Sequence, residues 1–320
     1  MFALNDKWIW DFWLYQDGGQ WHLYYLQADK SLEDPQLRHW NVSQGHAIST
    51  DLHHWDNQGT CLAPAEGPAW DDKTTWTGSV IKDDNGLWHL FYTGTCEAER
   101  GMKQRIGHAT STDGHHWERV GNGLALDLDP ELYEEYEQGQ WHDRAMRDPW
   151  VMKDPDGDGW LMYFTARVSG RDEPNDGGAI GLARSADLAH WTLEKPVYAG
   201  LFGQLEVPQV FKHGKHWYCL FCTAGEHWSK GYAADSPTDP VGGTHYLMAD
   251  HHLGPWRLAP GPFLDGGNPV PRYAGKIIRQ NDELSFMGFW HDTPDGTFIG
   301  QVSDPVPVKV NTEGLLHLTD

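Results

Sequence analysis

Three carboxylates stand in sequence contexts where an acidic side chain is unusual. Asp11 lies in WIWDFW with tryptophans on both sides, Asp148 follows Arg147 in MRDPW, and Glu206 lies between Leu and Val in QLEVPQ. Apolar surroundings raise the pKa of a carboxyl group, which suits a general acid, whereas an ionised partner serves as nucleophile or base. We therefore expect acid–base or nucleophilic chemistry here, with Glu206 as the carboxyl that keeps its proton to higher pH.

Local sequence also allows structural roles for these residues. Asp11 could be a surface residue that leads a strand, and Arg147 with Asp148 could form an exposed ion pair. Alternatively, the guanidinium of Arg147 orients the neighbouring carboxylate, or the hydroxyl groups of a substrate, through its fork of donors. Both interpretations stay open on local sequence alone.

Residues 154–159, DPDGDG, resemble the start of a calcium-binding loop, D-x-D-x-D-G. The twelfth position is Thr165 where such loops carry Glu, and a β-rich run follows in place of a helix, so a hairpin turn is the favoured interpretation. The 19 histidines show no HExxH-type spacing, and Cys219 and Cys222 are predicted to be buried thiols on opposite faces of a strand. The sequence predicts no metal site and no cofactor.

Two recurring patterns predict the elements that carry the carboxylates. One is an aromatic and apolar run after a turn rich in Gly, Asp or Asn, which is typical of a β-hairpin. The other is S-x-D-x-x-x-W, which begins at residues 49, 111 and 185, with a weaker copy at 249–256. Successive copies lie about four strands apart, a period typical of propellers and other repeat arrays. The aromatic runs occupy residues 21–27, 88–94, 160–166, 217–224 and 284–290.

Five aromatic runs predict five blades, and no long helical period interrupts them. We expect an all-β fold, a five-bladed β-propeller, as a single domain over residues 1–320 without a C-terminal β-sandwich. The innermost strands of a propeller converge on a central funnel, so residues at the start of strands in separate repeats can meet there. The fold thus predicts one shared site for Asp11, Asp148 and Glu206.

Composition limits the classes of partner. The chain has 320 residues, 39% of them hydrophobic, and a formal net charge of −22, which repels nucleic acids and anionic membranes. No apolar run approaches the roughly 18–20 residues of a membrane span, and no secretory signal begins the chain, so we expect a cytoplasmic protein. The 18 tryptophans favour a small carbohydrate as partner, because indole rings stack on sugars, although most are expected to fill the β core. The oligomeric state is not indicated.

An ordered set of motifs resembles the β-fructosidases, glycoside hydrolase families 32 and 68. WDFW at 10–13 is similar to the nucleophile motif of the levansucrase group, and HWNVSQGHAISTDLHHW at 39–55 resembles the W-G-H-A-x-S-x-D-L-x-x-W stretch of the invertase group. WTGSVIKDDNGLWHLFYTG at 76–94, RDP at 147–149 and LEVP at 205–208 resemble further segments in the same order. The resemblance extends from about Trp8 to the tail.

This resemblance implies a role for each carboxylate. Asp11 would be the nucleophile of a retaining reaction, Glu206 the acid/base, and Asp148 the residue that holds the sugar hydroxyls and stabilises the oxocarbenium-like transition state. The substrate would be a fructofuranoside such as sucrose, a short fructo-oligosaccharide or a difructose anhydride, cleaved by hydrolysis or by transfer to another sugar. The subsite for the reacting sugar would be lined by Trp10, Gln27, Trp40, Trp76, Thr77, Arg147 and Tyr273.

The chain departs from the family pattern at three points, and two alternative functions stay open. The invertase motif N-D-P-N-G is missing, Val207 replaces the Cys after the acid/base, and the C-terminal β-sandwich of the invertases is absent. One alternative is an inverting arabinosidase or xylosidase like glycoside hydrolase family 43, which uses the same fold, although RDP and WTGS argue against it. The other is a sugar-binding propeller without catalysis, which accounts for the tryptophans but not for three acids.

Overall fold

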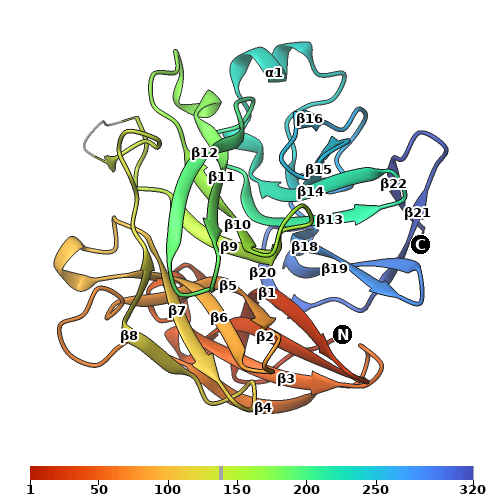
Figure 1. The fold of residues 1–320 in the computed structure, drawn as a ribbon. Helices are drawn as coiled ribbons and strands as arrows, with labels where there is room; N and C mark the ends of the chain where they lie inside the picture. Colours follow the sequence, from red (N-terminus) through yellow and green to blue (C-terminus); the bar gives the residue numbers. More distant parts are fainter. Residues whose placement is uncertain (137–139, 320) are drawn as a thin grey trace.

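The computed structural model describes residues 1–136 and 140–319 and consists almost entirely of antiparallel β-strands (Figure 1). The strands form five separate sheets of four or five strands each. Blade 1 contains β1 (Lys7–Asp17), β2 (Gln20–Asp29), β3 (Ser43–Ser49) and β4 (Asp56–Leu62). Blade 2 contains β5 (Thr74–Lys82), β6 (Trp88–Thr95), β7 (Arg105–Ser111) and β8 (Glu118–Leu126). Blade 3 contains β9 (Met146–Lys153), β10 (Trp160–Arg167), β11 (Gly178–Ser185) and β12 (Trp191–Ala199).

The last two blades each carry an additional short strand. In blade 4, β17 pairs with β15, and in blade 5, β20 pairs with β19. Blade 4 contains β13 (Glu206–His213), β14 (His216–Thr223), β15 (Gly242–Ala249), β16 (Arg257–Leu258) and β17 (Asp265–Gly267). Blade 5 contains β18 (Arg272–Gln280), β19 (Glu283–Asp292), β20 (Phe298–Val302), β21 (Val306–Val310) and β22 (Leu316–Leu318).

The helices lie in connections between strands. None of those in the described ranges is long and apolar enough to cross a membrane. Those with both ends in the described ranges include the 3-10 turns η1 (Lys30–Leu32), η2 (Pro35–Trp40), η3 (Glu97–Glu99), η5 (Pro174–Asp176) and η6 (Gly225–His227) and the short helix α1 (Lys230–Asp235).

The first strand of each blade lies at the centre of the molecule (Figure 1). Strand β1 contacts β5, β5 contacts β9, β9 contacts β13, β13 contacts β18, and β18 contacts β1. The N-terminal segment is joined to the last blade at Phe2. Its backbone N–H donates to the Val302 carbonyl of β20, and its carbonyl accepts from the Val302 N–H, both at 2.9 Å. The chain is therefore a five-bladed β-propeller, as the repeats predict.

The five aromatic runs of the sequence form the second strand of each blade: β2, β6, β10, β14 and β19. Strands β6, β10 and β14 are buried along their whole length on both faces. A strand covered by neighbouring blades on both faces needs a continuous apolar sequence instead of an alternating one. Cys219 and Cys222 lie on β14 as buried free thiols, in agreement with the sequence.

The S-x-D-x-x-x-W pattern forms the connection between the third and fourth strands of blades 1 to 3. In blade 1, the Ser49 hydroxyl accepts hydrogen bonds from the backbone N–H groups of Asp51 and Leu52, at 3.1 and 2.9 Å. The Asp51 carboxylate accepts from those of His53 and His54, both at 2.8 Å. Short side chains with oxygen acceptors satisfy the N–H groups that such a turn leaves free. The same arrangement recurs at Ser111 with Asp113 and at Ser185 with Asp187.

Candidate active site

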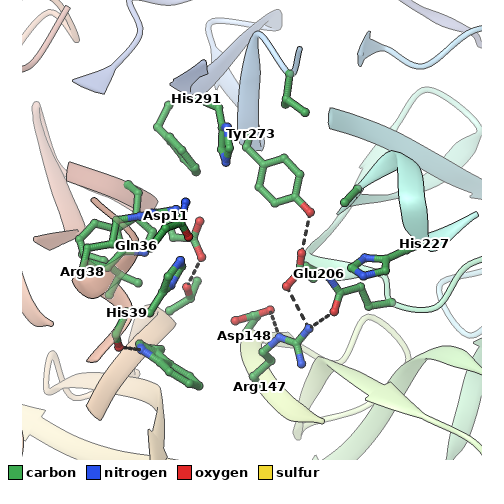
Figure 2. A pocket seen from close by; sticks show the side chains of 18 of the residues that line it. Asp11, Gln36, Arg38, His39, Arg147, Asp148, Glu206, His227, Tyr273 and His291 are labelled. Atoms are coloured by element: carbon green, nitrogen blue, oxygen red, sulfur yellow. Dashed lines mark hydrogen bonds and ion pairs between the residues drawn. The ribbon is translucent and has the colours of Figure 1, made fainter. Parts of the chain in front are cut away.

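A cavity of about 600 Å³ lies where the five inner strands begin, and its lining includes Asp11, Asp148 and Glu206. This volume falls within the range of roughly 300–1,000 Å³ typical of small-molecule sites. Figure 2 shows Asp11 on one side of the pocket, with Arg147, Asp148 and Glu206 across from it. Residues from separate blades, predicted to meet by their position in the repeat, are thus in one place.

Every inner strand carries a β-bulge at the same level. The pairing register shifts by one residue between Trp10 and Phe12 in β1, and between Trp76 and Gly78 in β5. Equivalent shifts occur opposite Phe164 in blade 3, after Glu206 in blade 4 and after Tyr273 in blade 5. A bulge bends the strand and redirects a side chain that regular pairing would send elsewhere.

These bulges explain which side chains reach the pocket. The residue just before each bulge lines the cavity in all five blades: Trp10, Trp76, Arg147, Glu206 and Tyr273. The bulged residue itself is Asp11, Thr77, Asp148, Val207 and Ala274 in blades 1 to 5, and the first three of these also line the cavity. Asp148, Val207 and Ala274 take positive φ angles of 57°, 53° and 50°. Such angles are strained for residues other than glycine and cluster at functional sites.

Asp11 is held by a neighbour from the next blade. The Thr77 hydroxyl donates a hydrogen bond to Asp11 Oδ2 at 2.6 Å. Burial raises the pKa of the Asp11 carboxyl to about 6, because a buried carboxylate loses hydration, and the Thr77 hydrogen bond acts in the opposite direction. Asp11 is therefore mostly ionised at neutral pH and can act as a nucleophile.

Asp148 lies deepest of the three carboxylates, with 5% of its surface exposed. Its Oδ2 accepts hydrogen bonds from the Thr165 hydroxyl at 2.9 Å and from the Val207 backbone N–H at 3.1 Å. Burial raises its pKa to about 7, although the nearby charge of Arg147, whose Nε lies 3.6 Å away, lowers it. In the free pocket Asp148 is thus the carboxyl that binds a proton most readily.

Glu206 corrects one expectation from the sequence. Burial by itself raises its pKa, but the charge of Arg147 and a hydrogen bond from Tyr273 outweigh burial and bring the pKa below its usual value. Arg147 Nη2 donates to Glu206 Oε1 at 2.9 Å, and the Tyr273 hydroxyl donates to Oε2 at 2.6 Å. The prediction of a raised pKa was wrong because the apolar neighbours in sequence, Leu205 and Val207, are not the groups that face the carboxylate.

Arg147 is itself fixed by two glutamines that sequence reasoning missed. Its Nη1 donates to Gln104 Oε1 at 3.2 Å and its Nη2 donates to Gln204 Oε1 at 2.8 Å. Both glutamines are buried and line the pocket. Arg147 is therefore an internal cation that links Asp148 to Glu206, and the exposed ion pair considered for it is excluded.

The opposite wall of the pocket was also largely missed by sequence reasoning. Arg38, at the end of η2, is buried and places its guanidinium 5.6 Å from the Trp10 ring centre and 4.0 Å from that of Phe298. Trp76 Nε1 donates to the His39 backbone carbonyl at 2.8 Å, and burial lowers the pKa of His39 to about 3, so its ring is neutral. The only sequence signal for this wall was that His39 begins the HWNVSQGHA segment and Arg38 directly precedes it.

Two predicted subsite residues do not line the cavity. Gln27 is 2% exposed, and its amide donates to Ser43 Oγ at 3.2 Å and to Thr60 Oγ1 at 2.8 Å, so it links strands within blade 1. This corrects the prediction for Gln27, because β2 is the second strand of its blade and lies behind β1. Trp40 is 43% exposed and stands outside the lining, with its ring centre 5.7 Å from that of Trp76. Trp10, Trp76, Thr77, Arg147 and Tyr273 all line the pocket.

Comparison with known proteins gives a family match over most of the chain. The family model described as glycosyl hydrolases family 32 N-terminal domain matches residues 6–296. Sucrose-6-phosphate hydrolase of Escherichia coli is 32% identical over 208 residues, covering 62% of this chain and 39% of that protein. Raffinose invertase of Escherichia coli is 31% identical over 215 residues, covering 65% and 39%. The chain thus spans about two fifths of the length of these curated relatives.

Solved structures share the fold at low sequence identity. The inulosucrase from Halalkalicoccus jeotgali bound to kestose superposes with a TM-score of 0.82 at 22% identity, covering 99% of this chain and 88% of that one. Bacillus subtilis levansucrase gives a TM-score of 0.77 at 15% identity, covering 99% and 87%. These likenesses support the propeller architecture across the whole chain.

Proposed function

We infer the function of this protein from its family membership and from the residues that line its pocket. The chain belongs to glycosyl hydrolases family 32, whose N-terminal domain model matches residues 6–296. We propose that it cleaves the glycosidic bond of a fructofuranoside, such as sucrose or a short fructo-oligosaccharide, with retention of configuration. Relatives named for sucrose-6-phosphate, raffinose and fructan cleavage support this substrate class. The proposal covers hydrolysis and also fructosyl transfer to a second sugar.

The observation that carries the proposal is the pocket lined by Asp11, Asp148 and Glu206, each bonded to different neighbours. The Asp11 carboxylate attacks the anomeric carbon and forms a covalent fructosyl–enzyme ester while the glycosidic bond breaks. Glu206 gives its proton to the departing oxygen, then removes a proton from the water or sugar hydroxyl that releases the fructosyl group. Asp148 accepts hydrogen bonds from the sugar hydroxyls and stabilises the positive charge that develops on the ring.

Protonation of Glu206 follows from coupling among the three carboxylates. In the free pocket Asp148 binds a proton most readily, with a pKa of about 7, and the charge of Glu206 raises that pKa. Coupling between two sites is reciprocal, so an ionised Asp148 in turn favours the protonated form of Glu206. Sugar hydroxyls that donate to Asp148 stabilise its ionised form and release its proton. The new negative charge then favours the protonated form of Glu206, so substrate binding itself prepares the general acid.

The test measures sugars released from sucrose, kestose, a difructose anhydride and an aryl arabinoside by the parent chain and two variants. Asp11→Ala and Glu206→Gln are expected to lower kcat by about 10³-fold or more on the fructosides while circular dichroism stays unchanged. The matched control is Asp17→Asn on the same strand β1. Asp17 lies outside the pocket lining, and its Oδ2 accepts a hydrogen bond from Lys82 Nζ at 2.8 Å. This variant should keep full activity. NMR of the first sugar formed should show retained configuration.

Four results would contradict the proposal. Inverted configuration, or activity confined to the arabinoside, would favour the family 43-like alternative. Fructoside cleavage that persists in both Asp11→Ala and Glu206→Gln would show that these residues do not perform the chemistry, and binding of sugar without any cleavage by the parent chain would favour the non-catalytic propeller.

A further inference from the structure

A cluster of histidines and aspartates joins blades 3 and 4 outside the pocket. The β9–β10 turn of blade 3 supplies Asp154 and Asp156, and the β15–β16 connection of blade 4 supplies His251 and His252. His251 Nε2 lies 2.8 Å from Asp156 Oδ2, and His252 Nε2 lies 3.5 Å from Asp154 Oδ1 and 3.9 Å from Asp156 Oδ2. One side-chain atom from each of Asp156, His251 and His252 lies within 4.8 Å of the others.

The blade repeat marks His252 as an exception. Counted back from the closing tryptophan, Trp256 in blade 4 and Trp55 in blade 1, His252 takes the position of Asp51 in the S-x-D-x-x-x-W pattern. In blade 1 this aspartate accepts hydrogen bonds from the turn's backbone N–H groups. A histidine in the same place has no carboxylate to accept them, and its ring faces the acidic β9–β10 turn of the preceding blade, blade 3, instead.

Within residues 1–136 and 140–319, no group makes a hydrogen bond to the buried Nε2 of His252, although Asp154 Oδ1 lies 3.5 Å away. His252 is 1% exposed, and its Nε2 is buried without a hydrogen-bond partner. A buried ring nitrogen left unpaired is costly, and a metal ion is one of the few groups that would satisfy it beside two carboxylates. The ring is fixed in this orientation by packing on Trp217, with 5.3 Å between ring centres.

We propose that this cluster binds a first-row transition-metal dication such as Zn²⁺, with Asp156, His251 and His252 as ligands. Two imidazoles and one carboxylate are the donor set that such ions prefer, whereas Ca²⁺ prefers oxygen alone. Zn²⁺ lies about 2.0–2.2 Å from each ligand, so donor atoms about 3–4 Å apart need only small movements. Asp156 and His251 are half exposed and give the ion access from solvent, where water completes the coordination.

The surrounding groups are compatible with a bound dication. Asp154 adds a second negative charge, and its own carboxylate is oriented by Arg184 and by the Asp156 backbone N–H at 3.0 Å. Coordination through His251 Nε2 requires the proton to move to Nδ1, which gives up the hydrogen bond from the Leu253 backbone N–H at 3.2 Å. That bond is on an exposed loop, so water can replace it.

A metal at this position would act as a clamp between blades and not as a catalyst. Asp154 and Asp148 stand six positions apart, near opposite ends of β9, which corresponds to roughly 20 Å along an extended strand. The ion would join the β9–β10 turn of blade 3 to the β15–β16 connection of blade 4. We therefore expect Zn²⁺ to raise thermal stability by about 4 °C at a free concentration roughly 100-fold above Kd.

The test uses the full chain without an affinity tag, stripped with EDTA and titrated with ZnCl₂ or CaCl₂ by calorimetry, with Tm measured in parallel. One Zn²⁺ per chain should bind, and the double variant Asp156→Asn/His251→Ala should weaken binding by about 100-fold or more and remove the gain in Tm. Both residues are exposed, so the variant should fold. Cobalt(II) should give the visible absorption of a low-symmetry site in the parent chain only.

The matched control is His54→Ala, because His54 is an exposed histidine paired with a single aspartate, Asp51, at 2.7 Å in blade 1. It should leave Zn²⁺ binding unchanged. Equal Zn²⁺ affinity in the parent chain and in the double variant would overturn the proposal, as would Ca²⁺ binding as tight as that of Zn²⁺. None of these measurements depends on the proposed glycosidase activity.

Discussion

Asp11 and Thr77 are 66 residues apart in the chain and meet at 2.6 Å in the pocket. Burial raises the pKa of Asp11 to about 6, while the Thr77 hydroxyl, which donates to the charged form, lowers it. Only the ionised carboxylate is nucleophilic, so activity should fall as the pH decreases through about 6. Burial and a single hydroxyl from the next blade, acting in opposite directions, thus set the lower end of the working pH range.

Replacement of Thr77 by Val should move this acidic limb to higher pH. The variant loses the hydrogen bond that favours ionised Asp11, so the pKa of Asp11 rises and a larger fraction is protonated at a given pH. We expect kcat/KM at pH 5.5 to fall about tenfold, the effect of losing one hydrogen bond to a charged group, with a smaller loss at pH 8. Profiles of kcat/KM against pH measure the shift.

Thr77→Ser is the matched control, because it keeps the donor hydroxyl and should keep the parent profile. An equal loss of kcat/KM at every pH in Thr77→Val would show that Thr77 acts through shape or substrate contact and not through the protonation of Asp11.

The inner-strand bulges are the elements that build the site. Regular pairing sends alternate side chains to opposite faces, whereas each bulge lets two successive residues of blades 1 to 3 reach the pocket. In blade 2 this arrangement depends on Gly78 next to Thr77. A Cβ on Gly78 would lie 2.1 Å from the Phe91 carbonyl oxygen, which is closer than atoms can approach.

Gly78→Ala should therefore displace β5 and move Thr77 and Trp76 out of place. We expect a loss of about 1–3 kcal/mol in the free energy of unfolding, and a loss of about 10- to 100-fold in kcat/KM from misplaced groups. Urea denaturation and steady-state kinetics test both effects.

The control is Gly19→Ala in the β1–β2 turn, where an added Cβ has no atom within 4 Å. It should change neither quantity. Parent-like activity in Gly78→Ala would show that the bulge can shift without disturbing the site.

Charge is the dominant property at the scale of the whole molecule. The net charge is −22, and the pocket itself is lined by more carboxylates than arginines. The two lining arginines, Arg38 and Arg147, are buried, and Arg147 is already occupied by Glu206. The lining carboxylates are Asp11, Asp143, Asp148, Glu206, Glu226 and Asp292.

This field should select neutral sugars over phosphorylated ones. We expect kcat/KM for sucrose to exceed that for sucrose 6-phosphate by about tenfold or more at low ionic strength, with a smaller ratio in salt because salt screens the repulsion. Steady-state kinetics with both sugars at two ionic strengths measures the ratio. A preference for the phosphate ester would show that Arg38 provides an anion site that the charge balance does not indicate.

Much of the fold could be predicted from the sequence because the repeat is local. The hairpin turns and the buried second strand of each blade, and the Ser–Asp turn of blades 1 to 3, each lie within one continuous segment, so five copies of the aromatic run predicted five blades. The placement of Asp11, Asp148 and Glu206 in one pocket also followed, because each lies near the start of the first strand of its repeat. Their chemical roles rest on the resemblance and await the variants described above.

Only the tertiary structure decided the electrostatics and the detailed lining of the site. Glu206 meets Arg147 and Tyr273, which are 59 and 67 residues away in the chain, and these contacts reverse the pKa shift that its sequence neighbours suggested. Gln104 and Gln204 belong to no motif. Gln27 was predicted to line the pocket, but its strand β2 lies behind the inner strand β1. Sequence by itself determined the blades and the candidate acids, because those depend on contacts within a repeat. The protonation of the acids depends on contacts between blades, which exist only once the ring has closed.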